Sequence, residues 1–230
     1  MSLSLLEFAD VYAAFGGREI LRGLSFRVEQ GVSTALVGLN GAGKSTLLRL
    51  ALDLITPTSG RISLMGRPAN HPVARQHLAY LPERFNSPHF LTGGELLASL
   101  LRLHGIRYSR HAAAEECERL GLPESVLEQR ARLYSKGMHQ ALGLVACLLT
   151  RKAFLVLDEP MSGLDPLSFE RVCERLRAAQ KTGVTLFFSS HAPNTLEQLC
   201  QRVILLQAGE IAFDGSPAAL GALYPRRATG

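Results

Sequence analysis

The sequence predicts an α/β protein built on a mostly parallel sheet. Two uninterrupted apolar runs, "AFLVLDEP" and "VTLFFSSH", are typical of parallel strands that are buried on both faces. Between them, "DPLSFERVCERLRAAQKTG" predicts a helix, because Asp165 can cap its start, Pro166 suits its first turn and Gly183 can end it. Strand, helix and strand at this spacing predict a βαβ crossover, which joins parallel strands.

The outer parts of the chain predict further strands around this core. Near the N-terminus, "LLEFADVYAAF" and "GLSFRVEQG" contain strand-like stretches closed by glycine, and we expect them to be antiparallel. The next segment, "VSTALVGLNGAGKSTLLRLALDLITP", passes from an apolar strand through glycines into an amphipathic helix that we expect to stop at Pro57. Near the C-terminus, "IAFDGSPAAL" predicts a closing strand, a turn and a helix.

The middle of the chain predicts helices alone. From Phe85 to Arg151 no run is strand-like, and "LTGGELLASLLRLHG" opens with Thr92 and Glu95 at the spacing of a capping box. A second segment, "RHAAAEECERLGL", is also strongly helix-forming. We therefore expect residues 1–230 to form a single domain, with a core of 1–84 and 152–225 and an inserted helical subdomain of 85–151.

Composition excludes several classes of protein. The 230 residues are 47% hydrophobic, which is enough to bury a core and excludes a disordered polyelectrolyte. No run without a charge or a breaker, such as Leu144 to Thr150, comes near the roughly 18 to 20 residues of a membrane span. The N-terminus "MSLSLLEFAD" lacks the basic region of a secretion signal. We expect a cytosolic chain.

Charge and cysteine content add weaker constraints. The net charge of +5 comes from scattered arginines, so solvated surface explains it better than a nucleic-acid or acidic-membrane interface. The four cysteines lie far apart in helical segments and form no paired motif. We interpret them as reduced, structural residues and not as metal ligands or disulfides.

The segment "GLNGAGKST" fits the phosphate-loop pattern G-x-x-x-x-G-K-[ST], with a strand before it and a helix after it. Glycines allow successive N–H groups to turn toward a phosphate, and the helix N-terminus adds the positive end of its dipole. Lys44 would bind the β- and γ-phosphates, and the Ser45 hydroxyl would bind Mg²⁺. The expected nucleotide-binding residues here are Gly38, Asn40, Gly41, Ala42, Gly43, Lys44, Ser45 and Thr46.

Two carboxylates follow the buried run "FLVL", at the carboxyl end of a strand, where parallel sheets bind ligands. Asp158 would hold Mg²⁺ through its water shell, and Glu159 would orient or deprotonate the attacking water. The pair "DE" alone could be an ordinary strand-terminal turn. Together with the phosphate loop, it predicts catalytic carboxylates.

A third segment, "YSKGMHQ", places Ser135, Lys136 and Gly137 before an apolar helix. The phosphate loop, "LDEP" and "YSKGMHQ", at these separations, resemble the nucleotide-binding subunit of an ABC transporter, a P-loop NTPase with a RecA-like core. The resemblance implies that "YSKGMHQ" is the signature loop, commonly L-S-G-G-Q, which caps ATP bound to a second copy. Ser135 would offer a hydroxyl, Gly137 would let backbone amides approach, and Lys136 would add positive charge.

The same resemblance assigns roles to residues elsewhere in the chain. "MSGLD", Met161 to Asp165, looks like the D-loop at the dimer seam, and His191 matches the switch histidine that contacts the γ-phosphate. Phe15 matches the aromatic residue that stacks on adenine, although an apolar core role stays open. The implied catalytic residues are Glu159, His191 and Lys44, and the implied metal-binding residues are Ser45, Asp158 and Glu83.

Two positions depart from the family pattern. In "YLPE", Glu83 stands where the family usually has Gln, so it either binds Mg²⁺ more strongly or stays swung out until closure. Ala141 stands where many relatives have Arg, and nothing in the sequence explains that change. "YLPE" with "SKGM" resembles a branch of bacterial exporter ATPases.

The resemblance implies a function in transport. It predicts an ATPase, with ATP and Mg²⁺ as cofactors, that forms a head-to-tail dimer, identical or mixed, on the inner face of the cell membrane and drives a separate transmembrane permease. No direct contact with nucleic acid is expected. An ABC-type ATPase acting on chromosomes or ribosomes is the alternative, although such relatives usually carry a long coiled-coil insert or two cassettes. A regulatory ATP-binding protein is a further alternative, and the presence of both Glu159 and His191 speaks against it.

Overall fold

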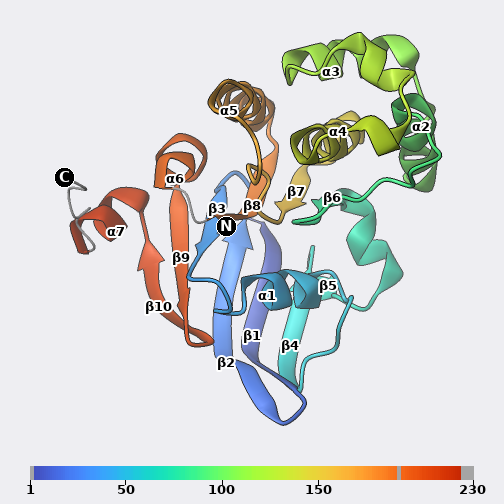
Figure 1. Cartoon of the computed structure of the whole chain (residues 1–230). Coiled ribbons are helices and arrows are strands. Elements are labelled where there is room, and N and C mark those ends of the chain that lie inside the picture. The colour runs from blue at the N-terminus through green and yellow to red at the C-terminus, as the bar shows by residue number, and fades with distance from the viewer. Residues whose placement is uncertain (1–2, 191–192, 224–230) are drawn as a thin grey trace. The chain divides into compact units, whose positions relative to one another are not determined.

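The computed structural model describes residues 3–190 and 193–223, and it divides into two compact units (Figure 1). Unit 1 comprises Met1–His77 and Thr185–Gly230, and unit 2 comprises Leu78–Val184. His191, the expected switch histidine, lies outside the described residues.

Unit 1 contains an antiparallel sheet formed by the first part of the chain. Its strands are β1 (Ser4–Phe15), β2 (Arg18–Glu29), β4 (Ser59–Leu64) and β5 (Arg67–Pro68), in the order β2-β1-β4-β5. One face of β1 and β2 is apolar, and the rings of Phe8 and Phe26 stack on it with centroids 4.8 Å apart. Phe26 also contacts Phe187 of the parallel strands. The expected antiparallel N-terminal strands are therefore confirmed.

The parallel strands of unit 1 carry the loop that precedes Lys44. Strand β3 (Thr34–Val37) pairs in parallel with β8 (Thr185–Ser190) on one side and with β9 (Arg202–Gln207) on the other, and β10 (Glu210–Gly215) is antiparallel to β9. Every residue of β8 is buried, as its uninterrupted apolar run predicts. The helices of this unit are α1 (Lys44–Ala51), α6 (Pro193–Leu199) and α7 (Pro217–Leu223), with the 3-10 turn η1 (Pro72–His77).

Helix α1 is shorter than the sequence predicts. We expected it to continue to Pro57, but it ends at Ala51. Asp53 then takes a left-handed backbone conformation with φ of 56°, and its carboxylate accepts a hydrogen bond of 3.0 Å from Arg75. Because Asp tolerates this conformation better than most residues and Arg75 holds it there, the helix stops six residues before Pro57.

Unit 2 holds a short parallel strand pair and the helical part of the chain. Strand β6 (Leu78–Leu81) pairs with β7 (Phe154–Leu157), whose residues are all buried. The helices are α2 (Gly93–Leu103), α3 (Arg110–Arg119), α4 (Lys136–Leu149) and α5 (Pro166–Lys181), with 3-10 turns η2 (Glu124–Leu127) and η3 (Ala131–Leu133). Between residues 85 and 151 the only β pairing is an isolated bridge of Thr92 with Arg130, so the predicted lack of strands is confirmed.

The predicted helix caps of unit 2 are present. Thr92 and Glu95 form the full capping box of α2, with side chain and backbone bonded reciprocally. The Asp165 carboxylate caps α5 by accepting from the backbone N–H groups of Leu167 and Ser168. These caps could be predicted from the sequence because every hydrogen-bond partner lies within three residues of the capping residue.

Helices α3 and α5 are joined by a buried ion pair. The carboxylate of Glu116, which is 3% exposed, accepts two hydrogen bonds from the guanidinium of Arg175 and a longer one from Arg119. A charge buried this deeply is tolerated only when it is paired and hydrogen-bonded. The pair therefore attaches α3 of the helical segment to α5, the helix that follows the acidic strand end.

The four cysteines are buried free thiols. Burial raises the pKa of the thiols of Cys117, Cys147 and Cys200 to about 12. Such thiols are protonated and unreactive at neutral pH, in keeping with a structural role. In the described part of the chain, no helix is long and apolar enough to cross a membrane.

Candidate nucleotide-binding site

The phosphate loop of unit 1 is shaped by close backbone contacts. It connects the carboxyl end of β3 to the first residue of α1. A Cβ atom built on Gly38 would lie 2.4 Å from the carbonyl oxygen of Leu206, at the end of β9. Gly43, the residue before α1, has φ of 106°, which side-chain-bearing residues rarely adopt. Both glycines are therefore required by the path of the backbone.

Lys44 is the first residue of α1 and is 7% exposed. Its ammonium donates a hydrogen bond of 2.8 Å to the carbonyl of Gly38, so the side chain folds back over the loop. The next two residues, Ser45 and Thr46, are half-buried in the first turn of the helix. A buried ammonium beside the amino end of a helix is suited to bind an anion.

Other predicted residues of unit 1 lie at the surface. Phe15 ends β1 and is 46% exposed, which places its ring outside the core and leaves area for a stacking partner. Asn40 and Gly41 are exposed at the tip of the phosphate loop. A cavity of about 520 Å³ borders this loop, lined mainly by apolar groups from Leu39 to Ala42 and from Leu205 to Ala208.

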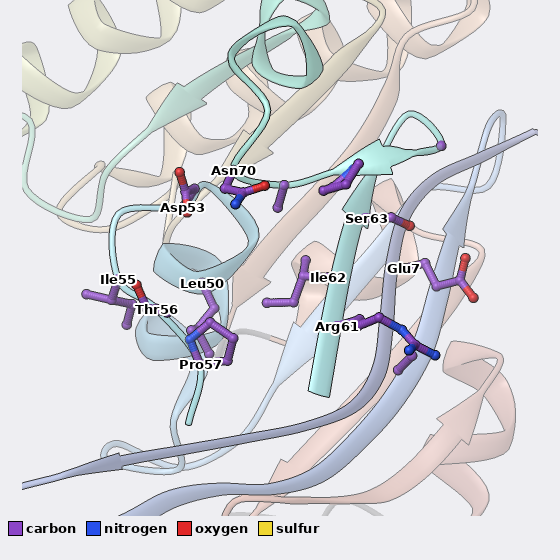
Figure 2. Close-up of a pocket in the computed structure, with 14 residues that line it drawn as sticks. Glu7, Leu50, Asp53, Ile55, Thr56, Pro57, Arg61, Ile62, Ser63 and Asn70 are labelled. Carbon is purple, nitrogen blue, oxygen red and sulfur yellow. The ribbon is translucent and has the colours of Figure 1, made fainter. Parts of the chain in front are cut away.

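A different cavity of unit 1, of about 500 Å³, lies away from the predicted site residues (Figure 2). Its lining includes Leu50 of α1, Ile62 of β4 and Pro57 of the connecting segment, with Arg61 and Asp53 among its polar residues. The volume is in the usual range for small-molecule sites. None of its 14 lining residues belongs to the phosphate loop, so this cavity is not the predicted nucleotide site.

In unit 2, three carboxylates follow the paired strands β6 and β7. Asp158 is 3% exposed, and its backbone N–H continues the strand pairing by donating to the carbonyl of Leu81 at 2.8 Å. Glu159 is half-buried and has φ of 47°, a left-handed conformation that turns the chain sharply after the strand. Glu83 is exposed two residues after β6. Since β6 and β7 are parallel, the structure brings Asp158, Glu159 and Glu83 to the same edge.

The predicted metal-binding residues are oxygen donors, the kind that magnesium prefers. Within the described residues, no group of three or more His, Cys, Asp or Glu side chains could hold a metal ion by itself. Mg²⁺ needs no such cage, because it keeps several waters and is usually held by one or two carboxylates together with substrate phosphates. The Asp158 carboxylate and the Ser45 hydroxyl are oxygen donors of the required kind.

The segment "YSKG" is held by side-chain hydrogen bonds within unit 2. The buried hydroxyl of Tyr134 contacts the carbonyls of Val126 at 2.6 Å and Gln129 at 2.9 Å. Ser135 caps α4 by accepting from the backbone N–H of Met138 at 3.2 Å. Lys136 donates to the hydroxyl of Ser162 at 3.0 Å. Ser135 and Lys136 are exposed, and Gly137 is half-buried.

Two contacts of this region were not expected from the sequence. The anchor formed by Tyr134 has partners five and eight residues earlier in the chain, and nothing in the pattern marks them. The buried side chain of Gln140 donates to the carbonyl of Pro82 at 3.4 Å, which connects α4 to the residue before Glu83. A buried polar residue inside an apolar helix was the available signal for this second contact.

Comparison with known proteins agrees with these motifs. A family model described as ABC transporter matches residues 21–162, more than half of the chain. An uncharacterized ABC transporter ATP-binding protein of Synechocystis is 39% identical over 204 residues, which cover 87% of this chain and 57% of that protein. The chain therefore spans little more than half the length of this relative.

One further relative and one solved structure cover more of the chain. The Nod factor export ATP-binding protein I of Rhizobium etli is 32% identical, over 94% of this chain and 70% of its own length. A structure described as the ATP binding subunit of an ABC transporter is 29% identical and superposes with a TM-score of 0.85, over 99% of this chain and 96% of its own. The predicted P-loop NTPase fold and ABC-type ATPase domain are confirmed, and the chain belongs to the ABC transporter family.

Proposed function

We propose that this chain binds MgATP, hydrolyses it in a head-to-tail dimer and thereby drives a separate membrane-spanning permease. The single observation that carries the proposal is the phosphate loop: a buried lysine at the start of α1, behind a backbone path that requires glycine. Membership of the ABC transporter family supports the coupling to transport.

The phosphate loop supplies binding. In the structure the Lys44 ammonium bonds the Gly38 carbonyl, and on ATP binding it exchanges this partner for the β- and γ-phosphate oxygens. Backbone N–H groups of the loop and of the first turn of α1 bind the remaining phosphate oxygens. Ser45 and Asp158 would hold Mg²⁺, which would neutralise negative charge on the phosphates. The exposed ring of Phe15 stacks on adenine.

The acidic strand end supplies the base. Glu159 orients the attacking water and accepts its proton, and the left-handed turn at this residue directs its side chain differently from that of the preceding Asp158. His191 is proposed to contact the γ-phosphate, and Glu83 to approach the metal as the dimer closes. The exposed position of Glu83 leaves it room to move.

The signature loop completes the site of a second copy. Ser135 and Gly137 lie at the start of α4, where the helix dipole favours an anion, and Ser135 is exposed. We propose that they cap the γ-phosphate of ATP held by the partner copy. Closure and reopening of the dimer would then move the helical segment of residues 85–151 relative to the core of 1–84 and 152–225 and so act on the permease.

The proposed hydrolysis is tested by Glu159→Gln in the full chain. The variant should bind ATP with unchanged affinity and lose turnover by about 10²- to 10⁴-fold, because only the base is removed. Glu170→Gln, on the exposed face of α5, is the matched control and should turn over normally. Equal turnover in Glu159→Gln and the wild type would remove Glu159 from this role.

The permease and the direction of transport need a second experiment. Export is supported by the similarity to the Nod factor export ATP-binding protein I of Rhizobium etli and by the "YLPE" and "SKGM" segments. The chain is purified together with its native partners from detergent-solubilised membranes. A multi-span membrane protein should co-purify with it in stoichiometric amount, and the complex should show ATPase activity. Recovery with ribosomes or DNA and no membrane protein would replace transport with the alternative of an ATPase acting on nucleic acid or ribosomes.

A further inference from the structure

The signature loop of unit 2 lies against the D-loop of the same chain. Besides the Lys136 to Ser162 hydrogen bond of 3.0 Å, a Cβ built on Gly137 would lie 3.0 Å from the carbonyl oxygen of Gly163. A Cβ built on Gly163 would lie 3.1 Å from Cδ of Lys136, so the lysine stem covers that glycine. One hydrogen bond and two close approaches thus join two loops that are 26 residues apart in sequence.

The D-loop is in turn bonded to the residue proposed as the base. The backbone N–H of Ser162 donates to the carbonyl of Glu159 at 3.0 Å and closes a tight turn. Glu159 enters this turn in a left-handed conformation, which non-glycine residues adopt only when their surroundings hold them there. A displacement of Ser162 therefore shifts the backbone of Glu159 through this one hydrogen bond.

We propose that Lys136 is a positioning residue that couples the signature loop to the turn carrying Glu159. Its ammonium bonds Ser162 and its stem packs on Gly163, and both contacts lie on the D-loop. This assignment differs from a role as a direct phosphate ligand, which its charge alone suggests. It rests on the proposed function, because the effect of the coupling appears in ATP hydrolysis.

The coupling has a consequence in a head-to-tail dimer. The signature loop of one copy contacts ATP held by the partner copy, whereas Glu159 acts on ATP held by its own copy. Lys136 connects the two, so ATP bound by the partner copy helps to orient the base at the other site. Positive cooperativity between the two sites follows, because each nucleotide stabilises the arrangement that the other site needs.

The experiment measures ATPase kinetics of the full chain for Lys136→Met, Ser162→Ala and the double variant. Lys136 is exposed, so the methionine, of similar length, leaves the fold intact. Lys136→Arg keeps a cationic donor, and Lys181→Met, at the exposed end of α5, is the matched control for loss of one positive charge. For each protein kcat, KM for ATP and the Hill coefficient are determined.

We expect Lys136→Met to lower kcat about three- to tenfold and to bring the Hill coefficient toward unity, with KM nearly unchanged. Lys136→Arg should restore most of both values, and Lys181→Met should match the wild type. In the Ser162→Ala background the lysine change should have little further effect, because the shared bond is already lost.

Other outcomes overturn the proposal. A higher KM with normal kcat, additive with Ser162→Ala, would make Lys136 a phosphate ligand. Kinetics equal to those of the wild type would remove it from catalysis altogether and leave the proposed ATPase function standing. Failure of the proposed function is seen separately, since the wild-type chain itself would then show no hydrolysis and the coupling would fall with it.

Discussion

The phosphate loop and the signature loop are held in place by different means. The phosphate loop depends on its backbone: Gly38 passes close to the Leu206 carbonyl, and Gly43 adopts a left-handed conformation just before α1. The signature loop depends on side chains, which are the buried Tyr134 hydroxyl, the Ser135 cap and the Lys136 ammonium. The conformation of the phosphate loop is therefore fixed by close backbone packing, whereas that of the signature loop depends on several separate hydrogen bonds.

This difference has consequences for substitutions. A loop defined by close backbone approach has no small adjustment available, so one added methyl group displaces several N–H groups together. In a loop held by separate side-chain hydrogen bonds, a single substitution removes only one of those bonds and leaves the others in place. We expect substitutions in the phosphate loop to lower ATP affinity strongly, and substitutions in the signature loop to change stability or turnover by degrees.

The largest expected effect is that of Gly38→Ala. The new Cβ would lie 2.4 Å from the Leu206 carbonyl oxygen, so either β9 or the loop must shift. ATP affinity, measured by calorimetric titration, should fall about 100-fold, since each lost N–H hydrogen bond to a charged phosphate costs about 1.5–3 kcal/mol. Gly41→Ala is the control in the same loop. Its φ of 81° strains alanine, but no atom lies within 4 Å, so a loss of about tenfold is expected. Equal losses in the two variants would show that close approach does not define this loop.

A smaller effect is expected of Tyr134→Phe in unit 2. Burial raises the pKa of Tyr134, so its hydroxyl stays protonated at neutral pH and can donate to the carbonyls of Val126 and Gln129. Its removal should lower the free energy of unfolding by about 1–2 kcal/mol in urea denaturation. ATP affinity should be unchanged.

The control for this variant is Tyr108→Phe. Tyr108 is half-buried in unit 2, and its hydroxyl makes no hydrogen bond within the described part of the chain. Stability losses of the same size in both variants would mean that the Tyr134 hydroxyl does not anchor the signature loop.

Ser135→Ala should have a still smaller effect on stability. The loss of the cap on α4, where the Ser135 hydroxyl accepts from Met138, should lower the free energy of unfolding by about 1 kcal/mol. Ser135→Asp separates this role from nucleotide contact. Aspartate caps helices as well as serine does, so the free energy of unfolding should return to the wild-type value. Its negative charge would face the γ-phosphate, so ATP turnover should be lower than in the wild type. Normal turnover in Ser135→Asp would place the γ-phosphate elsewhere.

The sequence predicted the parts of the fold whose causes are local. The capping box of Thr92 and Glu95 and the cap at Asp165 involve partners within three residues, and both are present. The strand before the phosphate loop and the helix after it follow from an apolar run, glycines and an amphipathic pattern. The motif residues of the phosphate loop lie together in unit 1 for the same reason, although their roles stay predictions.

Features that depend on distant partners were not predictable. Helix α1 ends early because Asp53 pairs with Arg75, 22 residues later, and no periodicity reveals that contact. The buried Glu116 pairs with Arg175 across 59 residues, and a helical pattern would place the glutamate among surface charges. The contact of Lys136 with Ser162 is of the same kind, and the charge of the lysine alone suggested a phosphate ligand instead.

The smallest expected effect concerns pH, and it should act on the stability of unit 2. His139, in the first turns of α4, has its pKa lowered by burial and by the nearby His89. Its ring nitrogen Nδ1 lies 3.2 Å from the Ser87 hydroxyl. Because the folded pKa lies below the unfolded value of about 6.5, neutral His139 contributes stability above that pH. The contribution is lost as the pH falls through the folded pKa.

The urea midpoint of the wild type should therefore fall between pH 7.5 and 5.5, and His139→Gln should reduce that fall. His104, whose pKa is also lowered, mainly by burial, accounts for part of the remaining slope, which His104→Gln would measure. The pH dependence should appear in stability more than in ATP affinity, because His139 and His104 both lie outside the phosphate loop. If the urea midpoint of His139→Gln falls with pH as much as that of the wild type, then the surroundings of His139 do not disfavour its protonation in the folded chain.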